Sequence, residues 1–519
     1  MWFGNLLSLN LLLLLFKYKT IIKMASGGIK SLAKDTAIYG LSSIVGRFLN
    51  WLLVPLYTNI FSDSEYGIVN NVYGYVAFAI VILTFGMETT FFRFINKKEE
   101  DANKVYSTIL LFIGLLAISF IGLCSLFINP VSNFLEYQNH QDYIMIMAIA
   151  VAFDAFTAIP FAFLRYKKRP IRFATLKLVH IGLNIGLNLF FILLCPVIYK
   201  SHPDLIGWFY NPDYGIGYIF VSNLIPSVLL AVLLIPDYTG FKYRFDKKLF
   251  KQMLNYTYPL VILGITGIMN QTVDKILYPF IFEDVNEGRA QLGIYSAGTK
   301  IAVVMAMFTQ AFRFAYEPFV FAQNQEKDNK TTYSKAMTFF VLLGLIMFLG
   351  VTYYIDILKY FIGPDYFAGI IVVPIVLIGE LFFGIYFNLS LWFKLIDKTM
   401  FGALFSIVGC VIIVAVNVIF VPIYGFIASA WATLVCYFIM TMLSYLLGQK
   451  YYPINYEVKK LTCYFVLAIA FYFAGAMPAI DSEVLRLAYR TILLSVFIAI
   501  IVKRDIPLSQ IPFINKYIK

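Results

Sequence analysis

Long apolar stretches alternate with short polar segments along the 519-residue chain. A helix needs about 20 apolar residues to cross the hydrocarbon core of a bilayer. The pattern therefore predicts an all-α, polytopic membrane protein with about 14 transmembrane helices. The predicted spans are 36–60, 68–92, 105–129, 143–164, 171–195, 216–236, 253–281, 292–322, 331–355, 368–393, 399–422, 424–447, 460–479 and 485–502.

Basic residues alternate between the connecting loops and predict the sidedness of the chain. One set of loops is rich in lysine and arginine and comprises 97–98, 165–169, 242–251, 327–335, 394–398 and 450–460. The loops between them contain only Lys200, Arg289, Lys359, Arg486 and Arg490. Since positive loops stay on the cytoplasmic side, we expect both termini in the cytoplasm and the chain in a bacterial inner (plasma) membrane.

The N-terminal segment 1–35 is expected to be cytoplasmic. Its apolar run Leu6–Phe16 is too short to span a bilayer, and lysines follow it. Met24 precedes Ala-Ser-Gly-Gly and is typical of a natural start. Residues 1–23 are therefore interpreted as preceding the true start or as an interfacial segment, with a fifteenth helix as the less favoured alternative.

Several ionisable residues fall within the predicted spans. The cations are Arg47, Arg93, Lys177, Lys275, Lys300 and Arg313, and the anions are Glu88, Asp154, Asp274, Glu317 and Glu380. A cation at the centre of a spanning helix costs about 2.5–3.5 kcal/mol on insertion scales. We therefore expect these groups to face one another or a wet cavity between helices.

The seventh span carries the clearest polar face. Thr266, Asn270 and Asp274 recur every four residues, and Gln271 and Lys275 lie on the adjacent row. A cavity rich in cations suits a phosphate-bearing substrate, because arginine and lysine bind phosphate oxygens. The candidate substrate-binding residues are Arg47, Asn270, Gln271, Lys275, Lys300 and Arg313. The candidates for ion coupling or charge pairing are Asp274, Glu317 and Glu380. Interhelical ion pairs or snorkelling remain the alternative, and they fit Arg93 and Lys177 well.

Composition removes other classes of function. The chain is 61% hydrophobic and 13% charged, and its net charge of +12 follows the loop pattern, so no nucleic-acid partner is expected. Three histidines and five scattered cysteines give no metal-site spacing. Residues 293–300 resemble a P-loop, but the lysine comes one residue late and Ile301 replaces Ser/Thr. We expect a protein that is not an enzyme and carries no cofactor.

Three sequence blocks resemble a known family. The first runs through Tyr39-Gly40, Gly46-Arg47 and Glu65-Tyr66-Gly67. The second runs from Tyr258-Pro259 through Asp274-Lys275 to Glu317-Pro318, and 163–173 is a weaker third. They resemble polysaccharide transporters, the O-antigen/oligosaccharide flippase-like branch of the multidrug/oligosaccharidyl-lipid/polysaccharide exporter superfamily.

The resemblance implies two pseudo-symmetric six-helix lobes and two additional C-terminal helices. The lobes would be 36–236 and 253–447, joined by the basic linker 237–252, with the additional helices in 460–502 and a cytoplasmic tail at 503–519. A weak repeat agrees with this division, because Phe-Arg-Phe occurs at 92–94 and 312–314, each time after a glycine that opens its span, Gly67 or Gly293.

The resemblance also implies a function. It is the transfer of polyprenyl-diphosphate-linked oligosaccharide across the inner membrane by alternating access, for a surface polysaccharide such as lipopolysaccharide O-antigen or capsule. Implied partners are the lipid-linked oligosaccharide, membrane lipid, H+ or Na+ as coupling ion, and other polysaccharide-assembly proteins. The alternatives are a peptidoglycan lipid-precursor flippase, a drug/cation antiporter, and a membrane glycan polymerase or ligase. The last predicts a large outer loop, and the longest one, about 196–215, is short.

Overall fold

The computed structural model describes residues 45–96, 101–239, 242–323, 329–396, 398–477 and 480–505, without the side chains of 315, 317–319, 321–323 and 329. All regular elements in these ranges are helices. The predicted N-terminal segment, including Met24, and the tail beyond 505 lie outside the described residues.

Twelve helices in the described part of the chain are long and apolar enough to span a membrane. They are Asp63–Ile95, Ala102–Leu126, Gln141–Tyr166, Pro170–Ser201, Lys247–Ile281, Val285–Phe314, Lys330–Tyr353, Pro364–Leu395, Met400–Tyr424, Phe426–Tyr451, Val458–Ala476 and Glu483–Asp505. The sixth predicted span is present as the shorter α12 (Gly217–Leu233). The first lies partly outside the described residues and is helical from 45 to 51 and in α3 (Val54–Ile60). The all-helical membrane fold is thereby confirmed.

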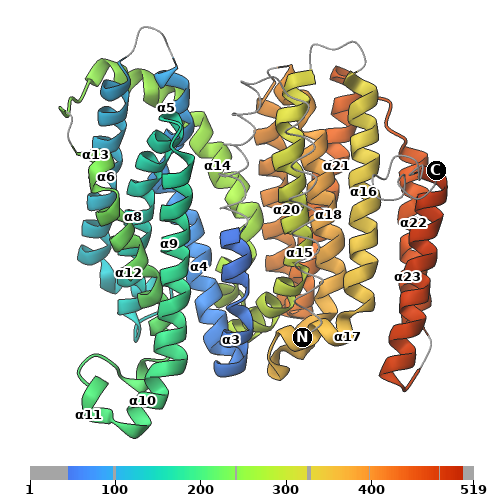
Figure 1. Ribbon diagram of the computed structural model, residues 1–519, viewed down its shortest axis with the longest axis horizontal. Coiled ribbons are helices and arrows are strands. Elements are labelled where there is room, and N and C mark those ends of the chain that lie inside the picture. Colours follow the sequence, from blue (N-terminus) through green and yellow to red (C-terminus); the bar gives the residue numbers. More distant parts are fainter. Residues whose placement is uncertain are drawn as a thin grey trace.

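The helices form two bundles with α14 (Lys247–Ile281) running obliquely between them (Figure 1). The first bundle contains α4 (Asp63–Thr84), α5 (Met87–Ile95), α6 (Ala102–Leu126), α8 (Gln141–Tyr166), α9 (Pro170–Leu189) and α12. The second contains α15 (Val285–Gln323), α16 (Asn329–Tyr353), α18 (Val373–Leu389), α20 (Met400–Tyr424) and α21 (Phe426–Tyr451). Beside α16 stand α22 (Val458–Ala476) and α23 (Glu483–Asp505).

We call the end of the bundles that carries 165–169, 242–251 and 394–398 the basic face. There α14 begins at Lys247, earlier than the predicted 253, because Asp246 caps it. The Asp246 carboxylate accepts a hydrogen bond from the Leu249 N–H at 2.8 Å and pairs with Lys104 at 2.6 Å. These two contacts, the backbone bond first, lower the pKa of Asp246 to about 2. Part of the predicted linker is therefore the first turn of a spanning helix.

The two bundles meet closely at the face opposite the basic one, where α4 and α15 cross. A Cβ atom placed on Gly67 would lie 1.8 Å from the Arg289 carbonyl oxygen, and one on Gly293 would lie 1.9 Å from that of Asp63. The contact is reciprocal, because each glycine packs on the residue four positions before the other glycine. The two glycines of the weak repeat are thus the crossing point, where a side chain would force the helices apart.

Further contacts close the same face. The Tyr366 hydroxyl donates to the Phe61 carbonyl oxygen at 2.8 Å, and the Gly363 N–H donates to the Thr58 hydroxyl at 3.0 Å. The Arg289 guanidinium donates to the Glu136 carbonyl oxygen at 2.5 Å. Between the bundles, α14 packs on α4, α5 and α6 of the first and on α15 and α20 of the second. The glycine crossing and these hydrogen bonds hold the bundles together at the face opposite the basic one.

We expect Gly67→Ala and Gly293→Ala each to destabilise the protein by about 1–3 kcal/mol, because the added methyl overpacks a backbone contact. One separation of α4 from α15 relieves both clashes, so the double variant is expected to cost little more than either single one. Thermal unfolding of the purified protein in detergent measures this.

Gly182→Ala is the matched control, since no atom lies within 4 Å of a Cβ at that helical position. It should be neutral or slightly stabilising. Equal effects of Gly67→Ala and Gly182→Ala would contradict the reciprocal crossing.

Candidate functional site

Lys275 lies on α14 at its contact with α4. Its backbone carbonyl accepts a hydrogen bond from the Asn71 side chain of α4 at 2.7 Å. Its ammonium donates to the Gln271 carbonyl oxygen at 3.0 Å and lies 3.9 Å from Asp274 Oδ1. The Lys275 side chain is 25% exposed, so the charge is held at the edge of the packed region.

Lys275 is close enough to interact electrostatically with Lys300 of α15 and Glu380 of α18. The Lys300 backbone carbonyl accepts a hydrogen bond from the Trp51 indole at 2.7 Å, and the Trp51 ring stacks on Phe361 at 4.0 Å. The first helix of the chain therefore reaches across to the second bundle beside Lys300. Three predicted site residues come together here from three helices.

Arg47, from the first helix of the chain, and Arg313 of α15 form a second pair of cations. Both side chains are exposed, and the two charges lie close enough to repel each other. The Arg313 guanidinium also lies 4.2 Å from the centre of the Phe387 ring of α18. Like charges this close within the spans raise the cost of placing them in a membrane.

The cations follow the inner side of the second bundle from the basic face inward. Arg313 and Lys300 are thirteen residues apart on α15, which corresponds to about 20 Å along a helix. Gly267 on α14 faces open space, with no atom within 4 Å of a Cβ there, and Gln271 is exposed. Cations of α14, of α15 and of the first helix of the chain therefore lie near one another where the two bundles adjoin.

The remaining predicted site residues have other surroundings. Asn270 is buried, and its amide donates to the Ser406 carbonyl oxygen of α20 at 3.0 Å, so it joins two helices. Asp274 is buried and accepts a hydrogen bond from the Tyr295 hydroxyl at 3.0 Å. The Glu317 side chain lies outside the described residues, so its predicted pairing with Arg313 stays a prediction.

A second charged cluster lies inside the first bundle. Asp154 of α8 is in electrostatic contact with Lys177 and His180 of α9, and His180 Nε2 lies 3.4 Å from the Ser227 hydroxyl of α12. The sequence showed Asp154 and Lys177 as charges within spans, but it did not single out His180. The available signal was the spacing of Lys177 and His180, which places them on one helix face.

Comparisons with known proteins agree with this architecture. The lipid II flippase MurJ, in an inward closed conformation, has a TM-score of 0.70 and 16% identity, over 89% of this chain and 98% of that chain. A multidrug resistance MATE family transporter of the MOP superfamily matches in its inward-facing conformation with TM-score 0.57 and 14% identity, over 82% and 96%. An outward-facing MATE conformation gives 0.55 and 13%, over 83% and 96%. No curated protein matches the chain in sequence.

These similarities define the class as a polytopic helical membrane protein with the fold shared by the MurJ flippase and the MATE transporters. The family model described as "Polysaccharide biosynthesis protein" matches residues 32–315. The chain belongs to this polysaccharide transporter-type family, as the sequence blocks predicted. The structural relatives are by title flippases and transporters rather than enzymes.

We expect Tyr295→Phe to lower the free energy of unfolding by about 1.5–3 kcal/mol, because a buried carboxylate loses a hydrogen-bond donor. Thermal unfolding in detergent measures the change, with Tyr360→Phe at an exposed position as control. An unchanged midpoint would show that the Lys275 N–H, which also donates to Asp274, holds the carboxylate by itself.

Proposed function

We propose that the chain transfers polyprenyl-diphosphate-linked oligosaccharide from the cytoplasmic to the outer leaflet of a bacterial inner membrane. The basic face would lie in the cytoplasm, where the sequence also predicts both termini. One observation carries the proposal: four cations of different helices lie in two neighbouring pairs, Arg47 with Arg313 and Lys275 with Lys300.

The chemistry of these four cations fits a diphosphate headgroup. A polar glycan and a charged diphosphate pay a large desolvation cost in hydrocarbon. The four cations offset the diphosphate charge, and the guanidinium groups match phosphate oxygens in geometry. The exposed Gln271 is available for sugar hydroxyls, while the polyprenyl chain remains in lipid.

The contacts that connect the two bundles support transport by alternating access. The first part of α14 is attached to the first bundle, where the Thr257 and Thr90 hydroxyls lie 2.6 Å apart. Its later part is attached to α20 through Asn270. Opening the other face requires the contact at Gly67 and Gly293 to separate, and α14, which Asn71 of α4 also binds at the Lys275 carbonyl, must then change its packing on one of the bundles. Pro259 lies between its two attachments and removes a backbone hydrogen bond there.

The proposal also includes ion coupling by acidic residues of α14, α15 and α18. The P-loop-like segment 293–300 is helical throughout within α15, so it does not form a phosphate-binding loop. An H+ or Na+ gradient would then drive transport, with Asp274, Glu317 and Glu380 as candidate coupling groups. The product would be a surface polysaccharide such as O-antigen or capsule, made with other polysaccharide-assembly proteins.

A peptidoglycan lipid-precursor flippase is the second candidate. It is favoured by the TM-score of 0.70 to the lipid II flippase MurJ, against 0.57 for the MATE transporter. The two candidates share the diphosphate and differ in the glycan. A drug/cation antiporter of the same fold would not need a cation-lined site.

The test uses purified protein in proteoliposomes that contain a lipid-linked oligosaccharide, with an outside glycosidase reporting the accessible headgroup. Faster loss of the protected pool than in empty vesicles is expected. Parallel vesicles with lipid II distinguish the two candidates. A pool that stays protected with all substrates and ion gradients would overturn the proposal.

Arg47→Gln and Arg313→Gln are each expected to slow flipping at least about ten-fold, because a charge-assisted phosphate contact contributes about 1.5–3 kcal/mol. Arg93→Gln is the matched control. Its guanidinium stacks on Tyr256 at 4.0 Å, within the first bundle and its α14 attachment. Equal rates for all three variants would show that the arginines between the bundles do not contact the substrate.

Cysteine labelling tests the opening toward the basic face. In a cysteine-free background, Gln271→Cys is expected to react with a membrane-impermeant maleimide added from the basic side, since this position is exposed between the bundles. Val273→Cys, two residues along α14 and buried, should remain unlabelled. Labelling of Gln271→Cys only from the other side would reverse the proposed orientation.

A further inference from the structure

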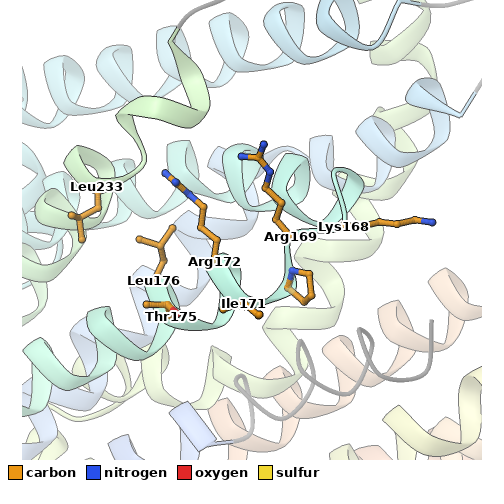
Figure 2. Close-up of a pocket in the computed structure, with 8 residues that line it drawn as sticks. Lys168, Arg169, Ile171, Arg172, Thr175, Leu176 and Leu233 are labelled. Atoms are coloured by element: carbon orange, nitrogen blue, oxygen red, sulfur yellow. The ribbon is translucent and has the colours of Figure 1, made fainter. Parts of the chain in front are cut away.

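A pocket of about 660 Å³ lies at the basic face, apart from the space between the bundles (Figure 2). Its volume is within the range of small-molecule sites, about 300–1,000 Å³. It is formed by the turn between α8 and α9 and by the end of α12. Its lining residues are Lys168, Arg169, Pro170, Ile171, Arg172, Thr175, Leu176 and Leu233.

Backbone hydrogen bonds define the turn that carries the basic residues of this pocket. Lys168 has a left-handed conformation, with φ of 53°, and its N–H donates to the Arg165 carbonyl oxygen at 3.1 Å. The Arg169 N–H donates to the Leu164 carbonyl oxygen at 3.0 Å. These two bonds are the pattern of a Schellman motif, and α9 starts immediately at Pro170. The turn is therefore well defined.

The net charge of the residues that line the pocket is positive. Figure 2 shows Arg169 and Arg172 projecting on the same side of the start of α9, with Lys168 extending away from them. Arg172 pairs with Asp237 of α13 (Ile235–Tyr238) at 2.7 Å, which holds its side chain in place. Arg169 is exposed, and no ion pair is recorded for it among the described residues. A site of this kind attracts an anion.

The apolar residues of the pocket continue into an exposed apolar surface along α9 and α12. Ile171 is 75% exposed, and Leu233 and Val232 of α12 are also exposed. Leu178 and Val179 continue the exposed apolar surface on α9. These apolar surfaces do not contribute to the binding of a soluble anion, whereas the acyl chains of a lipid pack on them. Basic pockets between spanning helices at the cytoplasmic side are suited to anionic lipid headgroups.

We propose that this pocket binds an anionic phospholipid of the leaflet at the basic face, with the phosphate between Arg169 and Arg172 and the acyl chains along Ile171, Leu233 and the α9–α12 surface. The lipid would be a resident ligand, distinct from the transported substrate. It would contact the start of α9 and the end of α12, which both belong to the first bundle.

The test is native mass spectrometry of the detergent-purified full chain titrated with phosphatidylglycerol, with phosphatidylcholine and inorganic phosphate in parallel. Wild-type protein is expected to retain phosphatidylglycerol in preference to phosphatidylcholine, and phosphate at the same concentration should not displace it. Equal retention of both lipids, or displacement by phosphate alone, would overturn the proposal.

Variants locate the site. Arg169→Gln is expected to lower phosphatidylglycerol occupancy about five-fold, as one basic contact to an anionic lipid implies. The Arg169→Gln substitution breaks no ion pair, so this variant should fold normally. Arg169→Lys should restore binding. Ile171→Asn should also weaken retention through the acyl contact. Lys251→Gln removes an exposed cation of the same face and is the control. If it weakened binding as much as Arg169→Gln, the lipid would respond only to the overall charge of that face.

Discussion

The close approach of α4 and α15 governs the rest of the architecture. Two backbones can touch at this distance only where both helices lack a side chain, and Gly67 and Gly293 meet this condition reciprocally. The crossing lies at the face opposite the basic one and fixes the first bundle against the second there. Charged groups of α14 and α15 lie along this junction, because a charge that faces hydrocarbon is costly.

Two kinds of buried charge coexist in the membrane region. Asp274 is satisfied internally by the Tyr295 hydroxyl, and the Asp154–Lys177–His180 cluster is confined to the first bundle. Such groups stabilise one arrangement of helices as long as each keeps its partner. Arg47 and Arg313 are different, because both are exposed and the two neighbouring charges have the same sign. The proposed transport function assigns the binding of the diphosphate to this second kind of charge.

The two C-terminal helices are fixed by ion pairs at both ends. At the face opposite the basic one, Arg486 and Arg490 of α23 both bind Asp356, at 2.9 and 2.8 Å. At the basic face, Lys460 of α22 pairs with Asp505 of α23. These contacts hold α22 and α23 against each other and near α16, outside the two bundles. Their attachment to one bundle leaves the other free to move.

The sequence by itself determined the spans, the charge asymmetry of the loops and the family. Hydropathy decides these because a backbone in lipid must satisfy its own hydrogen bonds as a helix. It also identified the intramembrane charges as the candidate site. Only the tertiary structure decided their partners: Asn270 is buried against α20, whereas Gln271, the next residue, is exposed. Helical periodicity assigns residues to faces, but which face meets which neighbour depends on contacts between segments far apart in the chain, such as Gly67 with Arg289.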